Sequence, residues 1–263
     1  MCVLFEAVAP ISLNDQLTFP EPLTDLEVFP ILKRIFERIY GTSPYQSPTD
    51  MGVNMVGFAI TDDQKAIESS KQEIIRRFLD AKCSLVNGKL SQSSEQKIQL
   101  IMNSLGIFTQ DRKCVSYALE KEKEKNVPCV AIELANGKMI SGKRTSLFEA
   151  TSSAIINCLK YFAKIPDEIN LISPAIIDPI SRLNSDMLHK NSHRLSLDEV
   201  LIALCITAKT NPMAETALAQ LPKLAYAQMH SSIQLHPDVV STLKHLLIDV
   251  TMETTQDQLY IYK

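Results

Sequence analysis

A long polar segment in the first quarter of the chain collects the side chains best suited to hold a ligand. It runs over residues 41–54, between two stretches of helical apolar spacing, and offers hydroxyl, carboxylate and amide groups from Ser47, Thr49, Asp50 and Asn54. Loops of this length without regular structure are usually functional or disordered, and this one is short of the charge that favours disorder. It contains no metal-ligand set and no nucleophile with its base. The chemistry that it favours is binding.

Basic side chains follow this segment on the next expected helix. Lys71, Arg76 and Arg77 could pair with a phosphate or a carboxylate held by the polar loop. The alternative is that the serine, threonine and aspartate groups of the loop only hydrogen-bond nearby backbone and cap helices. The sequence leaves both interpretations open.

The stretch 137–145 comes close to a Walker A loop, because a strand is expected before it and a helix after it. Arg144 stands where a magnesium-binding hydroxyl is needed, and residues 139–140 are apolar, which suits a hairpin strand better. A nucleotide loop is therefore disfavoured. Gly142, Lys143 and the start of the following helix remain candidates for binding an anion.

The order of elements in the second half is similar to the cytidine-deaminase-like fold, whose enzymes hold zinc through His or Cys at fixed positions. Around Glu149 the ligand position is occupied by Leu147, and the two cysteine positions near residue 212 are occupied by Met213 and Thr216. None of these three side chains can replace a thiolate or an imidazole. Zinc-dependent deamination is excluded, and no metal site is expected.

Two other groups of residues contain histidine, but neither has the arrangement that metal binding or catalysis requires. His189 and His193 have the spacing of one helical face but no accompanying ligand, so a basic loop over residues 190–194 is the simpler interpretation. His230 and Ser231 could supply a base and a hydroxyl. Adjacent residues of a strand point to opposite faces, however, so they are poorly placed to share a proton.

The elements that position these residues change character along the chain. Apolar residues at helical spacing predict helices near residues 28–39, 63–86, 94–105 and 111–125. After residue 126 the pattern alternates, and Asn136-Gly137 predicts a hairpin with a type I′ turn. Further helices are expected at residues 145–163, 196–209 and 237–247, and another begins at residue 212. Strands are expected at residues 225–233 and 248–254. A proline-rich link is expected over residues 172–179. A capping box at Ser196 and Glu199, and Asn211 before Pro212, set two helix starts.

The fold class that follows is α/β (α+β overall). We expect an atypical start over residues 1–23, a mainly helical region over 24–125 that contains the loop at 41–54, and an α/β layered domain over 126–263. The last resembles the cytidine-deaminase-like topology without its zinc site.

The composition of the chain indicates which kinds of molecule it is suited to bind and in which compartment it works. The 263 residues are 45% hydrophobic and 22% charged, with a formal net charge of −3, which is too balanced for a nucleic-acid binder. No apolar run reaches the length of a membrane span, and the N-terminus lacks the basic start of a signal peptide. Six cysteines are scattered without a C-x-x-C pair. We expect a reduced, cytoplasmic protein.

Several blocks of sequence are shared with a known group of proteins. They lie at residues 26–35, 47–55, 70–77, 142–143, 171–174, 198–204, 210–212, 220–224 and 230–231. In these blocks the chain resembles a bacterial family catalogued as domain of unknown function 1846 and as uncharacterised protein family 0371. The resemblance extends from about residue 24 to 255.

The resemblance implies that this chain is a C-terminal portion of a longer protein, from a truncated or split gene, because family members carry an upstream glycine-rich segment ending in Gly-Lys. Some members are labelled ATP-dependent peptidases, but no motif in this chain supports that label. The resemblance implies an α/β C-terminal part and no particular activity.

Together these observations favour a protein that binds a small anionic or nucleotide-like molecule. The ligand-binding candidates are Ser47, Thr49, Asp50, Asn54, Lys71, Arg76, Gly142 and Lys143. The alternatives are a non-catalytic assembly module and a hydrolase. No cofactor, nucleic acid or membrane is expected, and both homo-oligomerisation and enzymatic activity stay open.

Overall fold

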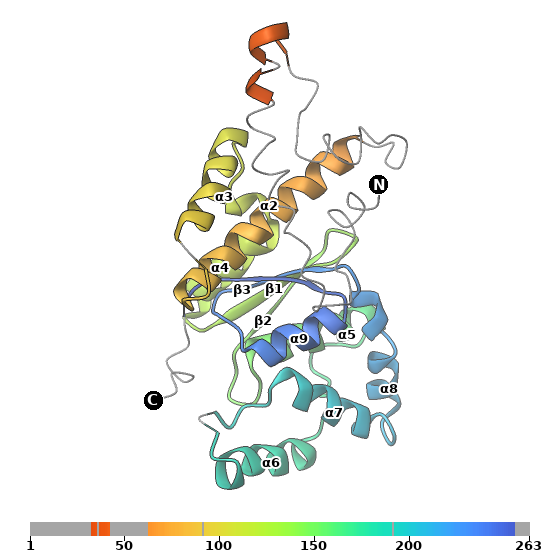
Figure 1. Ribbon diagram of the computed structural model, residues 1–263. Coiled ribbons are helices and arrows are strands. Elements are labelled where there is room, and N and C mark those ends of the chain that lie inside the picture. Colours follow the sequence, from red (N-terminus) through yellow and green to blue (C-terminus); the bar gives the residue numbers. More distant parts are fainter. Residues whose placement is uncertain (1–32, 36, 43–62, 91, 191, 256–263) are drawn as a thin grey trace, which may run out of the picture. The chain divides into compact units, whose positions relative to one another are not determined.

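The structure is a computed structural model, shown in Figure 1, that describes residues 33–35, 37–42, 63–90, 92–190 and 192–255. The chain divides into two compact units, residues 1–111 and residues 112–263. Most of the polar segment at 41–54 lies outside the described residues. Within the described stretches, no helix combines the length and the apolar character needed to cross a membrane.

The residues of the first unit that the structure describes are mainly helical, and its helices lie close to predicted ones. Residues 33–35 and 37–40 are helical, and Gly41 follows them with φ of 78°, the left-handed conformation that glycine adopts readily after a helix. The next elements are α2 (Asp63–Val86), α3 (Gln92–Leu105) and the short 3-10 helix η2 (Thr109–Asp111).

The apolar stripes of α2 and α3 are buried. On α2 the buried residues include Ile74, Ile75 and Phe78, which belong to the predicted stripe, and on α3 they include Ile98 and Met102. Spacings of three and four residues place such side chains on one face of a helix. Local periodicity predicted both helices, and the structure shows in addition that they contact each other.

The second unit contains a four-stranded mixed sheet. Its strands are β1 (Cys129–Glu133), β2 (Met139–Lys143), β3 (Gln228–Ser231) and β4 (Asp249–Met252), in the order β2-β1-β3-β4. β1 is antiparallel to both β2 and β3, whereas β3 and β4 are parallel. The predicted α/β character of this half of the chain is confirmed.

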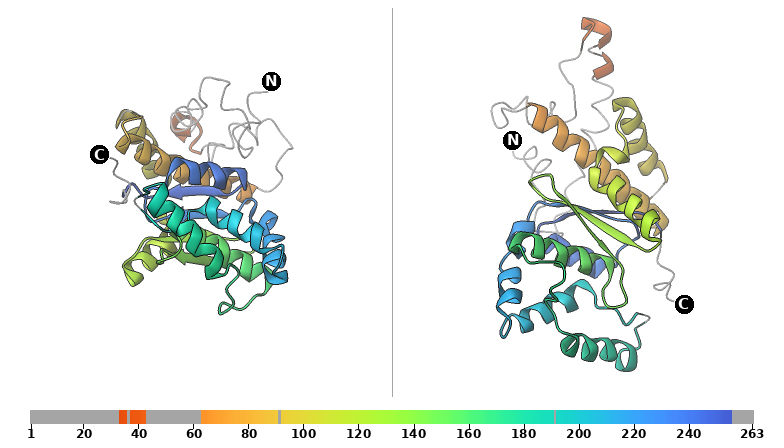
Figure 2. Two further views of the ribbon diagram at one scale, coloured as in Figure 1. Left: turned by 90° about the horizontal axis from the view of Figure 1, so that it is seen from below. Right: turned by 180° about the vertical axis from the view of Figure 1, so that it is seen from behind.

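Alternation along the strands gives the sheet two different faces. Val130, Ile132 and Met229 are buried in the main apolar cluster, which also contains residues of α5 (Ala150–Ala163). Ala131 instead packs with residues of α4 (Lys113–Lys125) on the opposite face. Figure 1 and the right-hand view of Figure 2 show α4 on one side of the sheet and α5 on the other.

The remaining helices gather on the α5 side. They are α6 (Pro174–Arg182), the π-helical turn η3 (Leu183–Met187), α7 (Leu197–Thr207), α8 (Pro212–Leu218), the 3-10 helix η4 (Leu221–Leu224) and α9 (Pro237–His245). α9 packs on β4, α7 and α8 pack against α5, and α6 packs against α7. α9 also makes the crossover between the parallel strands β3 and β4.

The β1–β2 hairpin forms where it is predicted, but its turn is of another type. Gly137 N–H donates to Leu134 O (2.8 Å), and Leu134 N–H donates to Lys138 O (3.0 Å). Gly137 has φ of 76°, whereas Asn136 is not among the described residues with positive φ. This is a type I turn closed by a glycine bulge, so the predicted type I′ turn is wrong.

Two predicted boundaries in the second unit also differ from the structure. α5 begins at Ala150 and not at Thr145, because Thr145 Oγ1 accepts hydrogen bonds from the N–H groups of Leu147 and Phe148 and holds a turn there. The predicted proline-rich link contains α6. Pro174 occupies the first turn of that helix, where an N–H group is not needed.

α4 belongs with the sheet. α4 contacts β1, β2 and β3 and lies in the second compact unit. Cys114, Val115 and Ala118 form its buried face. α4 is rich in charged residues, but the three small or branched side chains on its buried face allow it to cover the sheet.

Candidate functional site

The predicted site residues of the polar loop lie outside the described part of the chain. Ser47, Thr49, Asp50 and Asn54 all fall within residues 43–62. Their convergence on a ligand stays a prediction.

The predicted basic residues of α2 surround one carboxylate. Glu73 accepts from Arg76 Nε (2.7 Å) and from Arg77 Nε (2.6 Å), while Lys71 is half-buried on the same helix. Burial alone would raise the pKa of Glu73, but the hydrogen bonds and charges of the two arginines outweigh it and hold this pKa below its ordinary value. Glu73 therefore orients the side chains of both arginines on this part of α2.

Gly142 and Lys143 serve different faces of the sheet. A Cβ atom on Gly142 would lie 2.1 Å from the backbone nitrogen of Ala154, so the missing side chain lets β2 touch α5. Lys143 is exposed and pairs in the β ladder with Cys129. Residues 139–143 form a strand, which confirms that this stretch is not a Walker A loop.

A polar cluster lies where the chain enters α5. We call it the Arg144–Arg194 cluster; its members are Arg144, Thr145, Glu149, Ser192 and Arg194. Arg144 Nε donates to Glu149 Oε2 (2.9 Å), and Ser192 Oγ donates to Glu149 Oε1 (3.1 Å). Arg194 Nε donates to the carbonyl of Thr145 (2.8 Å). Both arginines are thus held beside the start of a 14-residue helix.

Backbone pairing fixes the two segments that carry this cluster. Phe148 and Leu195 form an isolated parallel bridge, Leu195 N–H donates to Leu147 O (2.8 Å), and Glu149 N–H donates to Leu195 O (3.2 Å). Ser152 Oγ adds a hydrogen bond to the same Leu195 carbonyl (3.2 Å). The positions of the arginine side chains therefore rest on a rigid support.

Arg194 carries the charge that the cluster does not neutralise. Glu149 pairs with Arg144, whereas among the residues that the structure describes no carboxylate pairs with Arg194. Its guanidinium is half-buried and reaches Ser192 Oγ (3.4 Å) in addition to Thr145 O. In the first turns of α5, Ser153 Oγ is buried with no hydrogen-bond partner in the described part of the chain. The basic loop 190–194 is evident in the sequence, but no local pattern predicts that it lies beside Glu149, the partner of Arg144.

The α4 face of the sheet holds a second polar group, centred on Arg112 and His230. Arg112 has no exposed surface and donates to Asp249 Oδ2 (3.1 Å) and to the Asp249 carbonyl (2.8 Å). Its Nε atom has no hydrogen-bond partner among the described residues. This group ties α4 to β4 and lies in the interior.

His230 is a buried imidazole. Thr251 Oγ1 donates to Met229 O (3.0 Å), so the hydrogen bond of 2.9 Å between Thr251 Oγ1 and His230 Nδ1 must be donated by Nδ1–H. The other ring nitrogen, Nε2, lies 3.5 Å from Glu253 Oε1. Burial lowers the pKa of His230, and the opposing effect of Glu253 is smaller.

Neither Ser231 nor a cysteine completes a catalytic pair with His230. Ser231 Oγ donates to Ile233 O (2.7 Å), which agrees with the expectation that these neighbours do not share a proton. Burial raises the pKa of Cys114 to about 11 and that of Cys158 to about 12, so these thiols are not ready nucleophiles. His230 itself has no exposed surface for a substrate to reach.

The remaining candidates for zinc chemistry stay apart. His189 and His193 are both exposed, and His189 has a positive φ of 50° in a loop, so they do not share a helical face. Within the described ranges, no three His, Cys, Asp or Glu side chains are grouped as metal ligands.

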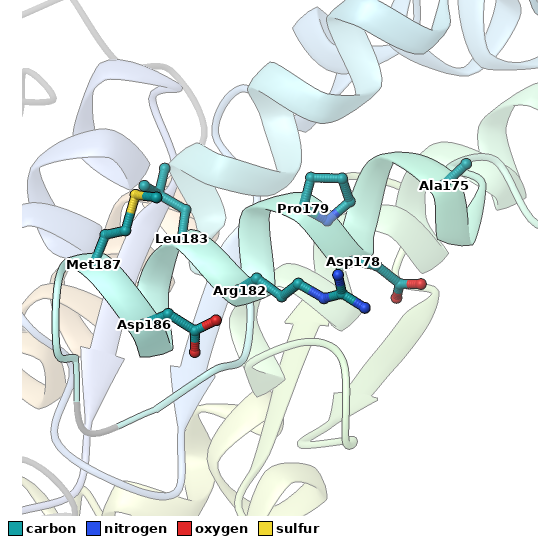
Figure 3. A pocket seen from close by; sticks show the side chains of 7 residues that line it. All are labelled: Ala175, Asp178, Pro179, Arg182, Leu183, Asp186 and Met187. Carbon is teal, nitrogen blue, oxygen red and sulfur yellow. The ribbon is translucent and has the colours of Figure 1, made fainter.

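A shallow groove lies along α6 and η3 (Figure 3). It is lined by Ala175, Asp178, Pro179, Arg182, Leu183, Asp186 and Met187. Figure 3 shows Arg182 between the carboxylates of Asp178 and Asp186 along the helix. All seven residues are exposed and come from one continuous helical segment. The groove is therefore open to the surface and is lined by that segment on one side. None of the predicted site residues lines it.

Comparison with known proteins places the chain among bacterial relatives. Residues 21–106 match the family described as domain of unknown function DUF1846, N-terminal, and residues 110–262 match domain of unknown function DUF1846, C-terminal. UPF0371 proteins of Streptococcus pneumoniae strains CGSP14 and P1031 are each 47% identical over 238 residues, which cover 90% of this chain and 48% of the relative.

The chain spans about half the length of these curated relatives. The junction between the two family matches falls between residues 106 and 110, next to the division of the structure at residue 111. Sequence similarity and compact units therefore agree on two parts. The chain belongs to the DUF1846 family, also named UPF0371, as its sequence blocks indicate.

Proposed function

We propose that the protein binds a small anionic or nucleotide-like molecule, and that the Arg144–Arg194 cluster forms part of the binding surface. The observation that carries this proposal is Arg194, a half-buried guanidinium held by a carbonyl and a serine hydroxyl without a carboxylate partner among the described residues. Guanidinium groups bind phosphate and carboxylate with two parallel hydrogen bonds.

A further feature supports an anion over a neutral ligand. The Arg144–Arg194 cluster holds two guanidinium groups, and Glu149 pairs with Arg144 and not with Arg194. The predicted binding residues Lys71, Arg76 and Lys143, together with the loop residues Ser47, Thr49, Asp50 and Asn54, stay part of the proposal. Gly142 is the predicted residue whose close contact with α5 leaves no room for a ligand.

We also propose a location for this protein and its relation to a larger protein. We expect the ligand to be bound by a cytoplasmic protein of which this chain is the C-terminal half, with a second part that resembles the cytidine-deaminase-like topology. Hydrolysis through His230 gains no support, because that imidazole is buried and lacks a nucleophile.

Thermal unfolding of the full chain in the presence of inorganic phosphate and nucleoside mono-, di- and triphosphates tests the proposal. A ligand at one hundred times its Kd should stabilise the folded state by about 2.7 kcal/mol, which is a shift of several degrees in Tm. Arg194→Gln should abolish the shift.

Arg182→Gln is the matched control, since it removes the same charge from an exposed arginine on α6. It should leave the shift intact. Equal shifts for wild type, Arg194→Gln and Arg182→Gln would refute a role for Arg194, and the lack of a shift with every compound would refute anion binding by this chain.

A further inference from the structure

The outward face of α7 is apolar although solvent surrounds it. Ile202 is 59% exposed and Ile206 is 57% exposed, and Cys205, between them, is also exposed. The opposite face of the same helix is fully packed, with Val200, Ala203, Leu204 and Thr207 all buried. A helix that is apolar on every side is normally buried on every side. Among the residues that the structure describes, this face of α7 therefore has no covering segment.

Charged residues stand at the two ends of the exposed stripe. At 100° per residue, Asp198, Ile202, Cys205 and Ile206 lie within about 100° of one another on one side of α7. Lys209 comes two residues after the last residue of the helix, Thr207. Asp198 is half-buried at the N-terminal end, where its Oδ1 accepts from Thr242 Oγ1 (2.6 Å). Lys209 is exposed and follows the last turn of α7. From its N-terminal end, the stripe therefore begins with an acidic residue, continues with apolar side chains and ends with a basic residue.

This order is self-complementary about a two-fold axis. The midpoint between positions 198 and 209 coincides with the midpoint between positions 202 and 205. An antiparallel second helix therefore places a base opposite each acid and an apolar side chain opposite each apolar side chain. Symmetric dimers use the same patch on both subunits in this way.

We propose that α7 is the contact surface for a second copy of this chain, with Asp198 facing Lys209 of the partner subunit and Ile202 packing against Cys205 of the partner subunit. The stripe is about 16 Å long, since eleven residues at a rise of 1.5 Å separate its charged ends. A surface of this length is small compared with a standard protein interface. The dimer therefore forms and dissociates with concentration. This inference does not depend on anion binding.

Sedimentation velocity of the full chain over a wide range of concentration tests the interface. The wild type should shift from monomer to dimer as concentration rises, and Ile202→Glu should stay monomeric because a carboxylate would be buried at the centre of the contact. Leu100→Glu on α3 is the matched control, since Leu100 is 67% exposed on another helix. It should dimerise like the wild type.

A charge exchange tests the proposed orientation. Lys209→Glu should weaken the dimer, because like charges would then face each other, and adding Asp198→Lys in the same chain should restore it. Thermal unfolding of each variant verifies that it is folded. A third measurement is maleimide labelling, read by mass spectrometry at Cys205, which should slow as the protein concentration rises.

A monomer at every concentration would overturn the proposal and would assign the stripe to a different partner. A dimer that Ile202→Glu leaves intact would place the contact elsewhere. Failure of the double exchange to restore a dimer weakened by Lys209→Glu would overturn the antiparallel arrangement.

Discussion

Arg112 joins the start of α4 to the edge strand β4 by two hydrogen bonds to Asp249, one to the side chain and one to the main chain. The arginine has no exposed surface, whereas the side chain of Asp249 keeps 39% of its surface exposed. Because water does not reach the Arg112 guanidinium, its charge is stabilised by this contact, whereas the Asp249 carboxylate also faces solvent.

Arg112→Met should lower the free energy of unfolding by about 2–3 kcal/mol, because hydrogen bonds between charged groups are lost. Urea unfolding measures this change. Lys113→Met is the neighbouring control, since Lys113 is largely exposed and should change stability by less than about 0.5 kcal/mol. Equal effects of the two substitutions would show that the Arg112 contacts contribute nothing.

Gly142→Ala should destabilise the second unit by about 3 kcal/mol or more. The new Cβ would lie 2.1 Å from Ala154 N, so β2 and α5 would have to separate. Denaturant unfolding of the full chain gives the change in free energy. Ser141→Ala on the same strand should have a small effect, and a Gly142→Ala protein of wild-type stability would contradict the close approach.

The stability of the protein should fall as the pH is lowered through the ordinary range of histidine. His230 has its pKa lowered from 6.5 by burial, so between the folded and unfolded values the unfolded chain binds more protons. The stabilising contribution is complete above about pH 6.5 and is lost progressively below it.

Urea unfolding at a series of pH values, for the wild type and for His230→Asn, isolates this contribution. The asparagine keeps an N–H donor for Thr251 but does not titrate, so its stability should depend less on pH in this range. Identical pH profiles for the two proteins would exclude His230 as the group responsible.

Asn211→Ala should lower stability by about 1 kcal/mol. The Asn211 side chain accepts a hydrogen bond from the N–H of Met213 (3.0 Å) and caps α8. Thr210→Ala, one residue earlier, is the control and should have the smaller effect in the same thermal or urea unfolding experiment. The reverse order would show that the cap is not the stabilising contact.

Local chemistry determined the elements that the sequence predicts correctly. Asn136-Gly137 predicts a hairpin because few residues tolerate positive φ, and the structure has the hairpin, although only Gly137 takes the positive value. Asn211 and Pro212 mark a helix start because their hydrogen-bonding needs are satisfied within one turn. α6 was missed because proline breaks a helix in most positions. In the structure Pro174 lies in the first turn of α6, where it is tolerated, and Pro179 lies inside the same helix.

The tertiary structure alone decided which distant residues meet. The contacts between Arg112 and Asp249, and between Glu149 and Ser192, join segments 137 and 43 residues apart, and no periodicity encodes such a pairing. Whether the face of α7 is covered also depends on packing, since its apolar sequence predicts burial on every side. The sequence by itself determined helices, strands, caps and family, because these follow from neighbouring residues. The folded chain decided the charge clusters and the exposed stripe, because both arise only where remote segments pack or fail to pack.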